Sequence, residues 1–162
     1  MVFPDDPNTY DIEDQFLWGD SVMIIPIVVE GATQTNAYLP AGIWYDYVKQ
    51  HAVSNVVQKG TYMKMDIPLD KIGVLLRGGR IVFSQKPELT TRETRKSSFD
   101  LVVALDERGD AEGSLYWDDG QDYRIAKNKN YNLVELHAHR VGFALKKLLL
   151  FFVLLINGYR LR

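Results

Sequence analysis

The sequence has no cysteine among its 162 residues and a formal net charge of only −2. The absence of cysteine excludes a disulfide-stabilised scaffold and a cysteine-ligated zinc site. Without a net positive charge there is no global field to hold a phosphate backbone, so we expect no nucleic-acid partner. The glycine-rich phosphate loop, the G-x-S-x-G nucleophile motif and the H-E-x-x-H zinc motif are also absent. We therefore predict that the chain binds no metal and no cofactor.

Long apolar segments are scarce, and the longest lies near the end of the chain. Residues 148–156 are nine consecutive apolar residues, and they follow Lys146 and Lys147. A helix needs about 20 such residues to cross a bilayer, so we predict no membrane span. Residues 141–162 are instead expected to be an atypical apolar tail, either an aggregation-prone strand or an end out of its context. Residues 1–6 lack the basic and apolar regions of a signal peptide.

The composition favours β structure. Apolar residues make up 46% of the chain and aromatic residues 12%, which is enough to bury a core. Short apolar or alternating segments between Gly, Pro and Asp predict strands. After residue 30 the predicted strands are 35–39, 43–47, 62–67, 73–76, 80–83, 99–105, 113–117 and 131–137. This spacing is typical of a β-sandwich.

The segment 21–29 differs from these strands because it is apolar without alternation. Such a run predicts a strand that is buried on both faces, as in a parallel sheet. All later segments resemble antiparallel hairpins, so we expect this strand to need parallel neighbours that the chain lacks. The chain is therefore predicted to be a fragment. A short helix is predicted around 11–17, with Thr9 as its N-cap, and the polar residues 84–98 are the predicted domain boundary.

Clustered acidic residues are the first candidates for chemistry. A glycosidase needs two carboxyl groups about 5–10 Å apart in a sugar-binding cleft, and proximity in sequence does not supply that geometry. A solvated loop is the favoured interpretation of the acidic residues between Asp5 and Asp14. Asp118-Asp119-Gly120 lacks the ligand register of a calcium loop and predicts a tight turn, as does Arg77-Gly78-Gly79 between two strands. The three histidines have no ligand spacing linked to carboxylates.

Trp44, Tyr45 and Tyr47 are the candidates for a sugar-stacking platform. Alternation along a strand puts Tyr45 and Tyr47 on one face and Trp44 on the other. At least one of these faces is expected to be core. We predict a sugar contact for Trp44 and Tyr47 only, and no catalytic residue among them.

Six segments in a fixed order resemble glycoside hydrolase family 31. Asp11–Ser21 with Met23–Ile27 resembles the family's I-D-x-Q-F-L-x-G-x-x-L-L-V-x-P-V segment, and Tyr38-Leu39-Pro40 with Trp44–Tyr47 resembles its Y-x-P-x-x-x-W-Y-D-Y block. Pro68–Asp70 with Leu76–Gly79 and Ile81 resembles P-L-D-x-I-x-x-x-x-R-G-G-x-I. The remaining matches are Leu89–Arg95, Val103–Leu105 and Leu115–Gly120. The group within the family that the segments are most similar to is that of lysosomal acid α-glucosidase and intestinal maltase.

The resemblance implies a mainly β architecture with four parts. Residues 1–29 would be the end of a (β/α)8 catalytic barrel, including its last strand, and residues 30–86 a proximal β-sandwich. Residues 87–140 would begin a distal β-sandwich, and residues 141–162 would be the atypical tail. The family's catalytic aspartates lie on earlier barrel strands, and its W-x-D-M-N-E segment is absent here. No catalytic residue can therefore be carried over.

The resemblance implies that the chain is the C-terminal part of a retaining α-glucosidase. It would stabilise the barrel, would be inactive alone and would act on α-linked glucosides only through the barrel. It would also imply a lysosomal or otherwise secretory location. Two alternatives are a free-standing carbohydrate-binding β-sandwich that uses Trp44 and Tyr47, and a truncated product without function.

Overall fold

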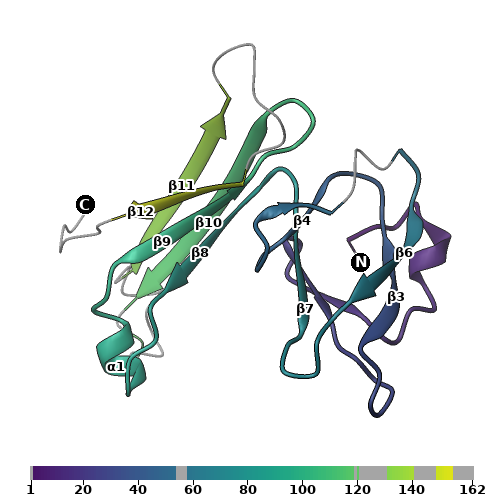
Figure 1. Cartoon of the computed structure of the whole chain (residues 1–162). Helices are drawn as coiled ribbons and strands as arrows, with labels where there is room; N and C mark the ends of the chain where they lie inside the picture. The colour runs from purple at the N-terminus through teal and green to yellow at the C-terminus, as the bar shows by residue number, and fades with distance from the viewer. Residues whose placement is uncertain (1, 54–57, 119, 121–130, 141–148, 155–162) are drawn as a thin grey trace.

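The computed structural model of the chain describes residues 2–53, 58–118, 120 and 131–140, together with the backbone of 149–154. Within these ranges the strands form two five-stranded sheets and one two-stranded sheet, and none of the sheets closes into a barrel. Figure 1 shows two lobes, with β1–β7 in one and β8–β12 in the other. The fold is therefore mainly β, as the composition and spacing predict.

The first lobe contains two sheets. The larger sheet has the strand order β1 (Phe16–Trp18), β2 (Val22–Ile25), β7 (Gly73–Arg77), β4 (Trp44–Asp46) and β5 (His51–Ala52). The smaller sheet is an antiparallel pair of β3 (Gln34–Leu39) and β6 (Thr61–Asp66). One face of the larger sheet contributes to a core with the smaller one, whose buried members are Met23, Ile25, Ala37, Leu39, Trp44, Met65, Ile67 and Leu75.

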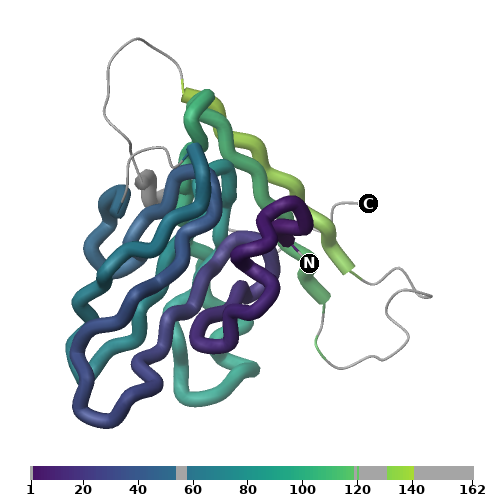
Figure 2. Tube along the Cα trace, turned by 90° about the vertical axis from the view of Figure 1, so that its right-hand side faces the viewer, coloured from purple at the N-terminus to yellow at the C-terminus, as the bar shows by residue number. Residues whose placement is uncertain are grey.

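The second lobe is a single five-stranded sheet. Its order is β11 (Tyr131–His139), β10 (Asp110–Asp118), β8 (Arg80–Gln85), β9 (Phe99–Ala104) and β12 (Leu149–Leu154). Figure 2 shows β10 and β11 side by side as a long antiparallel arm. The one-turn helix α1 (Thr91–Thr94) connects β8 to β9, and the 3-10 helix η1 (Pro7–Thr9) precedes the first lobe. Residues 149–154 of the apolar tail thus add a strand to this sheet.

The two lobes share a core cluster. Ile43, Tyr45 and Leu76 from the first lobe pack with Val102 and Ala104 from the second. In the paired strands β4 and β7, alternate residues point to opposite faces, so Trp44 and Leu75 join the first core while Tyr45 and Leu76 join this one. The larger sheet is therefore buried on both faces where β4 and β7 pair, which the strand prediction from alternation could not reveal.

The expectation that 21–29 needs parallel neighbours from outside the chain is wrong. β2 pairs antiparallel with β1 on one side and with β7 on the other. Its run lacks alternation because Met23 and Ile25 enter the first core while Val22 packs against the cluster shared with the second lobe. An apolar run therefore indicated burial on both faces correctly, but burial of this kind does not require a parallel sheet.

Three local predictions also need correction. Residues 11–17 form no helix: the 3-10 helix η1 begins at Pro7 with Asp6 as its N-cap, and Phe16–Trp18 is a strand. Proline is tolerated there because the first N–H of a helix has no intrahelical partner. The polar residues 84–98 hold α1 and connect two strands of one sheet, so the chain changes sheet earlier, between β7 and β8. Residues 77–79 are therefore a corner between sheets, not a hairpin.

Backbone hydrogen bonds at this corner attach it to both lobes. Gly78 donates its N–H to the Ile43 carbonyl at 2.8 Å, and Gly79 donates to the Ala104 carbonyl at 2.7 Å. The Gly79 carbonyl accepts from the Glu112 N–H at 3.1 Å. Glycine is needed at position 79 because its φ is +85°, in the left-handed region. We call residues 77–80 the sheet corner.

Close approach explains the other glycine of the sheet corner. A Cβ on Gly78 would lie 3.0 Å from the Leu105 carbonyl oxygen and 3.2 Å from Ile43. The Tyr45 hydroxyl donates to the same Leu105 carbonyl at 2.7 Å. Burial, helped by the negative charge of Asp106, raises the pKa of Tyr45 to about 12. The corner thus combines backbone bonds, tight packing and one buried side-chain hydrogen bond.

Gly78→Ala is expected to destabilise the chain by about 1–3 kcal/mol, because the added methyl would push the two lobes apart. The measurement is the free energy of unfolding in urea, followed by far-UV circular dichroism. Ala41→Val adds carbon atoms at an exposed position outside the sheet corner and should change stability by less than about 0.5 kcal/mol. Equal stability of the two variants would show that the close approach at Gly78 has no energetic weight.

Tyr45→Phe should cost about 1–2 kcal/mol at neutral pH, because the Leu105 carbonyl loses its donor inside the core. The raised pKa of Tyr45 gives a second readout. The contribution of Tyr45 to stability is complete below pH 10, where the residue is neutral in both the folded and the unfolded chain. It is lost as pH rises towards about 12, because the unfolded chain ionises Tyr45 more readily than the folded chain does. Urea unfolding at pH 8 and pH 11 should show this loss in the wild type and a smaller one in Tyr45→Phe. A matching loss in Tyr45→Phe would contradict the assignment, and Tyr62→Phe is the exposed control.

Candidate functional site

Trp44, the first of the two predicted sugar-contact residues, has no exposed surface. Its relative exposure is 0%, and its indole N–H donates to the Pro40 carbonyl at 2.9 Å. The ring lies in the first core, where it contacts Phe3 with ring centroids 6.4 Å apart. A sugar could not stack on Trp44 unless this core opened. The structure therefore contradicts a role for Trp44 as a stacking platform.

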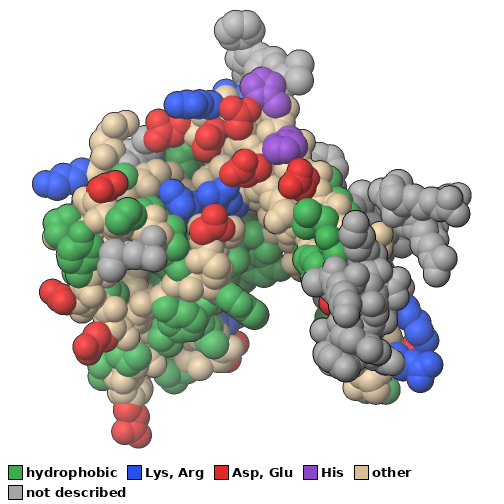
Figure 3. Space-filling view, turned by 180° about the vertical axis from the view of Figure 1, so that it is seen from behind, with side chains coloured by type: hydrophobic (Ala, Val, Ile, Leu, Met, Phe, Trp, Pro, Cys, Tyr) green, Lys and Arg blue, Asp and Glu red, His purple; other side chains and the backbone are tan. Residues whose placement is uncertain are grey.

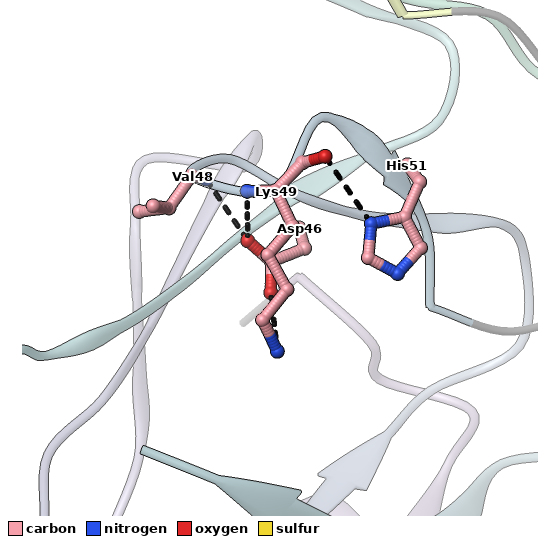
Figure 4. A network of polar contacts seen from close by, with 4 residues as sticks. All are labelled: Asp46, Val48, Lys49 and His51. Carbon is pink, nitrogen blue, oxygen red and sulfur yellow. Dashed lines mark hydrogen bonds and ion pairs between the residues drawn. The ribbon is translucent and has the colours of Figure 1, made fainter. Parts of the chain in front are cut away.

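Tyr47, the second predicted contact, is half-buried against the cluster shared by the lobes. Its position is fixed by a backbone hydrogen bond to the Val74 carbonyl at 3.0 Å and by the turn that follows it. In that turn the Asp46 carboxylate accepts from the N–H groups of Val48 and Lys49, at 2.9 and 2.7 Å (Figure 4). Tyr47 is thus held on the opposite face from Trp44, and the two do not form one platform.

A surface hollow of about 520 Å³ lies beside the sheet corner. Acidic, basic and histidine side chains gather where the lobes meet (Figure 3). Arg80 is central among them: its guanidinium lies 2.9 Å from Asp20 and 2.5 Å from Glu112. Asp20 precedes β2 and Glu112 lies in β10, so Arg80 connects the two lobes by charge. A hydrogen bond from Ser21, together with the charge of Arg80, lowers the pKa of Asp20.

Two acidic groups of this hollow, Asp106 and Asp110, are engaged in local structure. Asp106 accepts from the N–H groups of Arg108 and Asp110, at 2.8 and 2.9 Å, and so stabilises its own turn. Asp110 pairs with His139 across β10 and β11. Burial lowers the pKa of Arg77, with repulsion from Arg80 as a second cause. Asp106 and Asp110 thus serve local contacts, and Glu112 pairs with Arg80.

The acidic N-terminal cluster supplies a structural contact. Asp6 accepts from the Tyr38 hydroxyl at 2.8 Å, which lowers the pKa of that carboxyl, and from Asn8. Burial and the same hydrogen bond raise the pKa of Tyr38. Asp6 therefore attaches the N-terminal segment to β3.

Two polar residues with structural roles escaped the sequence reasoning. Gln15 uses its side-chain amide as a substitute for strand pairing: it donates to the Tyr38 carbonyl and accepts from the Tyr38 N–H, both at 2.7 Å. Arg80 was predicted only as part of a strand. No local pattern reveals such long-range partners, because each side chain reaches residues more than twenty positions away.

Neither a metal site nor a membrane helix is found in the described part of the chain. The residues with described side chains contain no group of three or more His, Asp or Glu side chains that could hold a metal ion. No helix within the described ranges is long and apolar enough to cross a membrane.

Comparison with known proteins identifies the family. The family model described as Glycosyl hydrolase family 31 C-terminal domain matches residues 1–82. The chain is 41% identical over 133 residues to human "Probable maltase-glucoamylase 2", and the match covers 82% of this chain and 5% of that protein. It is 37% identical over 153 residues to rat "Lysosomal alpha-glucosidase", and this match covers 85% of this chain and 16% of that protein. The chain therefore spans only a small part of these relatives.

Solved structures are also similar to most of the chain. A glucosidase II alpha subunit in a Tris-bound form superimposes with a TM-score of 0.72 at 27% identity, covering 79% of this chain and 14% of that one. A GH31 alpha-xylosidase from Xanthomonas citri gives a TM-score of 0.73 at 27% identity, covering 86% and 14%. Together with the match of the family model, these similarities confirm the resemblance read from the six segments. The chain belongs to glycosyl hydrolase family 31 and corresponds to a C-terminal portion of its members.

Proposed function

We propose that the chain is the C-terminal part of a retaining α-glucosidase and that it stabilises the catalytic barrel without supplying catalytic aspartates. The observation that carries this proposal is that the carboxylates near the sheet corner make structural contacts within the chain. The carboxylates Asp20, Asp106, Asp110 and Glu112 near the sheet corner hold turns, strands or Arg80. A retaining glycosidase instead needs two carboxyl groups about 5 Å apart that face a bound sugar.

The names of the relatives support the reaction and the location. The rat relative is a lysosomal alpha-glucosidase and the human relative a probable maltase-glucoamylase. We extend to this chain the hydrolysis of α-linked glucosides, through a barrel outside residues 1–162, and a location in the lysosome or elsewhere in the secretory pathway. The alternative of a free-standing carbohydrate-binding module loses support, because Trp44 has no exposed ring face. A sugar contact at Tyr47 remains a proposal.

The proposed domain division follows from the family. The resemblance implies that residues 1–29 are the end of the catalytic barrel with its last strand. Because β2 lies between β1 and β7 in the larger sheet of the first lobe, we propose instead that these residues adjoin the barrel. Residues 30–86 would form the proximal β-sandwich, and residues 87–140 the start of the distal one. The sheet corner argues for one adjustment: β8 belongs with the distal sheet, because it pairs with β9 over its whole length.

The 162-residue chain alone is expected not to hydrolyse an aryl α-glucoside, because the sequence lacks the family's W-x-D-M-N-E segment, and a retaining enzyme needs a pair of catalytic carboxylates. The measurement is release of the chromophore by the purified chain over hours at pH 4–7. Turnover that persists through purification and disappears on substitution of a carboxylate in this chain would contradict the proposal.

A chimera tests the supporting role directly. In it, the matched segment of rat lysosomal alpha-glucosidase is replaced by this chain. We expect the chimera to fold and to hydrolyse the aryl α-glucoside within about tenfold of the parent enzyme, or about 1.4 kcal/mol in activation free energy. The control is the parent enzyme without that segment, which should be insoluble or inactive. An inactive, unfolded chimera would contradict the proposal.

A further inference from the structure

The strands β1, β2 and β7 of the larger sheet have one face that turns toward the second lobe. The second lobe covers only part of this face. In antiparallel strands, residues opposite each other point to the same face. Trp18, Val22 and Leu76 form one row on the face that turns toward the second lobe, since Trp18 opposes Val22 and Val22 opposes Leu76. The second lobe covers Leu76 and Val22, which belong to the shared cluster with Val102 and Ala104.

The next row on this face lies further from that contact. Phe16 opposes Ile24, and Ile24 opposes Val74. Ile24 and Val74 are half-buried, whereas Phe16 is 58% exposed and Trp18 is 75% exposed. We call Phe16, Trp18, Ile24 and Val74 the β1 shelf. Figure 3 shows apolar side chains beside the notch that separates the lobes.

The β1 shelf is held in place by its neighbours. Leu17, between the two exposed aromatic residues, packs against the first core and so fixes the opposite orientation of Phe16 and Trp18. β1 is also the edge strand of its sheet, with one side of its backbone unpaired by any described strand. Large apolar patches and open sheet edges of this kind mark surfaces that other protein segments cover.

The side chains of the shelf indicate what kind of partner covers it. Its four side chains carry no charge, and their only polar hydrogen is the indole N–H of Trp18. A sugar needs several hydrogen-bonding groups around its hydroxyls, whereas an apolar protein surface needs none. The chain spans only 5% and 16% of its human and rat relatives, so most of a family 31 enzyme lies outside it. The shelf also falls largely within residues 1–29, the part expected to adjoin the barrel.

We propose that the β1 shelf is the docking surface for the remainder of the family 31 enzyme, which covers Phe16 and Trp18 with an apolar protein surface. This inference rests on the proposed function and names the face of the chain through which the supporting contact is made. Within the shelf, Trp18 lies in the row of Val22 and Leu76, next to the sheet corner, and Phe16, Ile24 and Val74 lie in the next row away from it.

Hydroxyl-radical footprinting with mass spectrometry tests the proposal on two proteins. One is the 162-residue chain, and the other is the chimera in which it replaces the matched segment of rat lysosomal alpha-glucosidase. Oxidation of Trp18 should be at least about fivefold slower in the chimera, because the core of a protein interface is packed like an interior. Tyr62, which is 64% exposed on the smaller sheet, is the internal control and should be oxidised at the same rate in both.

The outcomes separate the docking surface from the function. An active chimera in which Trp18 and Tyr62 are both oxidised as fast as in the isolated chain would overturn the docking surface and leave the proposed function intact. An unfolded, inactive chimera would overturn both. Protection of Trp18 in the isolated chain that rises with concentration, together with a dimer that Trp18→Ser dissociates, would assign the shelf to a second copy and also overturn the proposal.

Discussion

The hydrogen bonds of the sheet corner are the constraint on which the two-lobed structure depends. Gly78 bonds to Ile43 in the first lobe, and Gly79 bonds to Ala104 in the second. Because these donors are adjacent in sequence, the two sheets can differ in direction but cannot separate. Tyr45 reinforces the joint by reaching from the first lobe to the Leu105 carbonyl, and Arg80 adds a charged connection between Asp20 and Glu112.

The proposed role as a support for a catalytic barrel would make use of such a joint. A module that bound sugar on its own would expose its aromatic residues around polar groups, whereas here Trp44 is buried and the exposed aromatic residues of β1 lie on an apolar face. Trp44 thus contributes to internal cohesion, while Phe16 and Trp18 contribute to an exposed apolar surface. Both features fit a piece of a larger enzyme better than an independent binding domain.

The sequence predicted most strands because alternation and turn residues are local signals. It also predicted the family from six ordered segments, and the opposite faces of Trp44 and Tyr45. It failed where burial comes from distant partners. The segment 21–29 was assigned to a parallel sheet because burial of Met23 and Val22 on opposite faces has the same pattern in either kind of sheet. Residues 77–79 were predicted as a hairpin turn because a Gly-Gly pair is compatible with a hairpin and with a corner between two sheets. The hydrogen bonds of Gly78 to Ile43 and of Gly79 to Ala104 show that the segment is a corner.

The central claim is that the sheet corner makes both lobes one cooperative unit. Hydrogen exchange of the 162-residue chain in increasing urea tests this claim most directly, because it measures the opening free energy of each strand separately. The account predicts that the slowest amides of β7, in the first lobe, and of β9, in the second, open with the same free energy and the same dependence on urea. Separate opening free energies, with one lobe exchanging while the other stays protected, would contradict it.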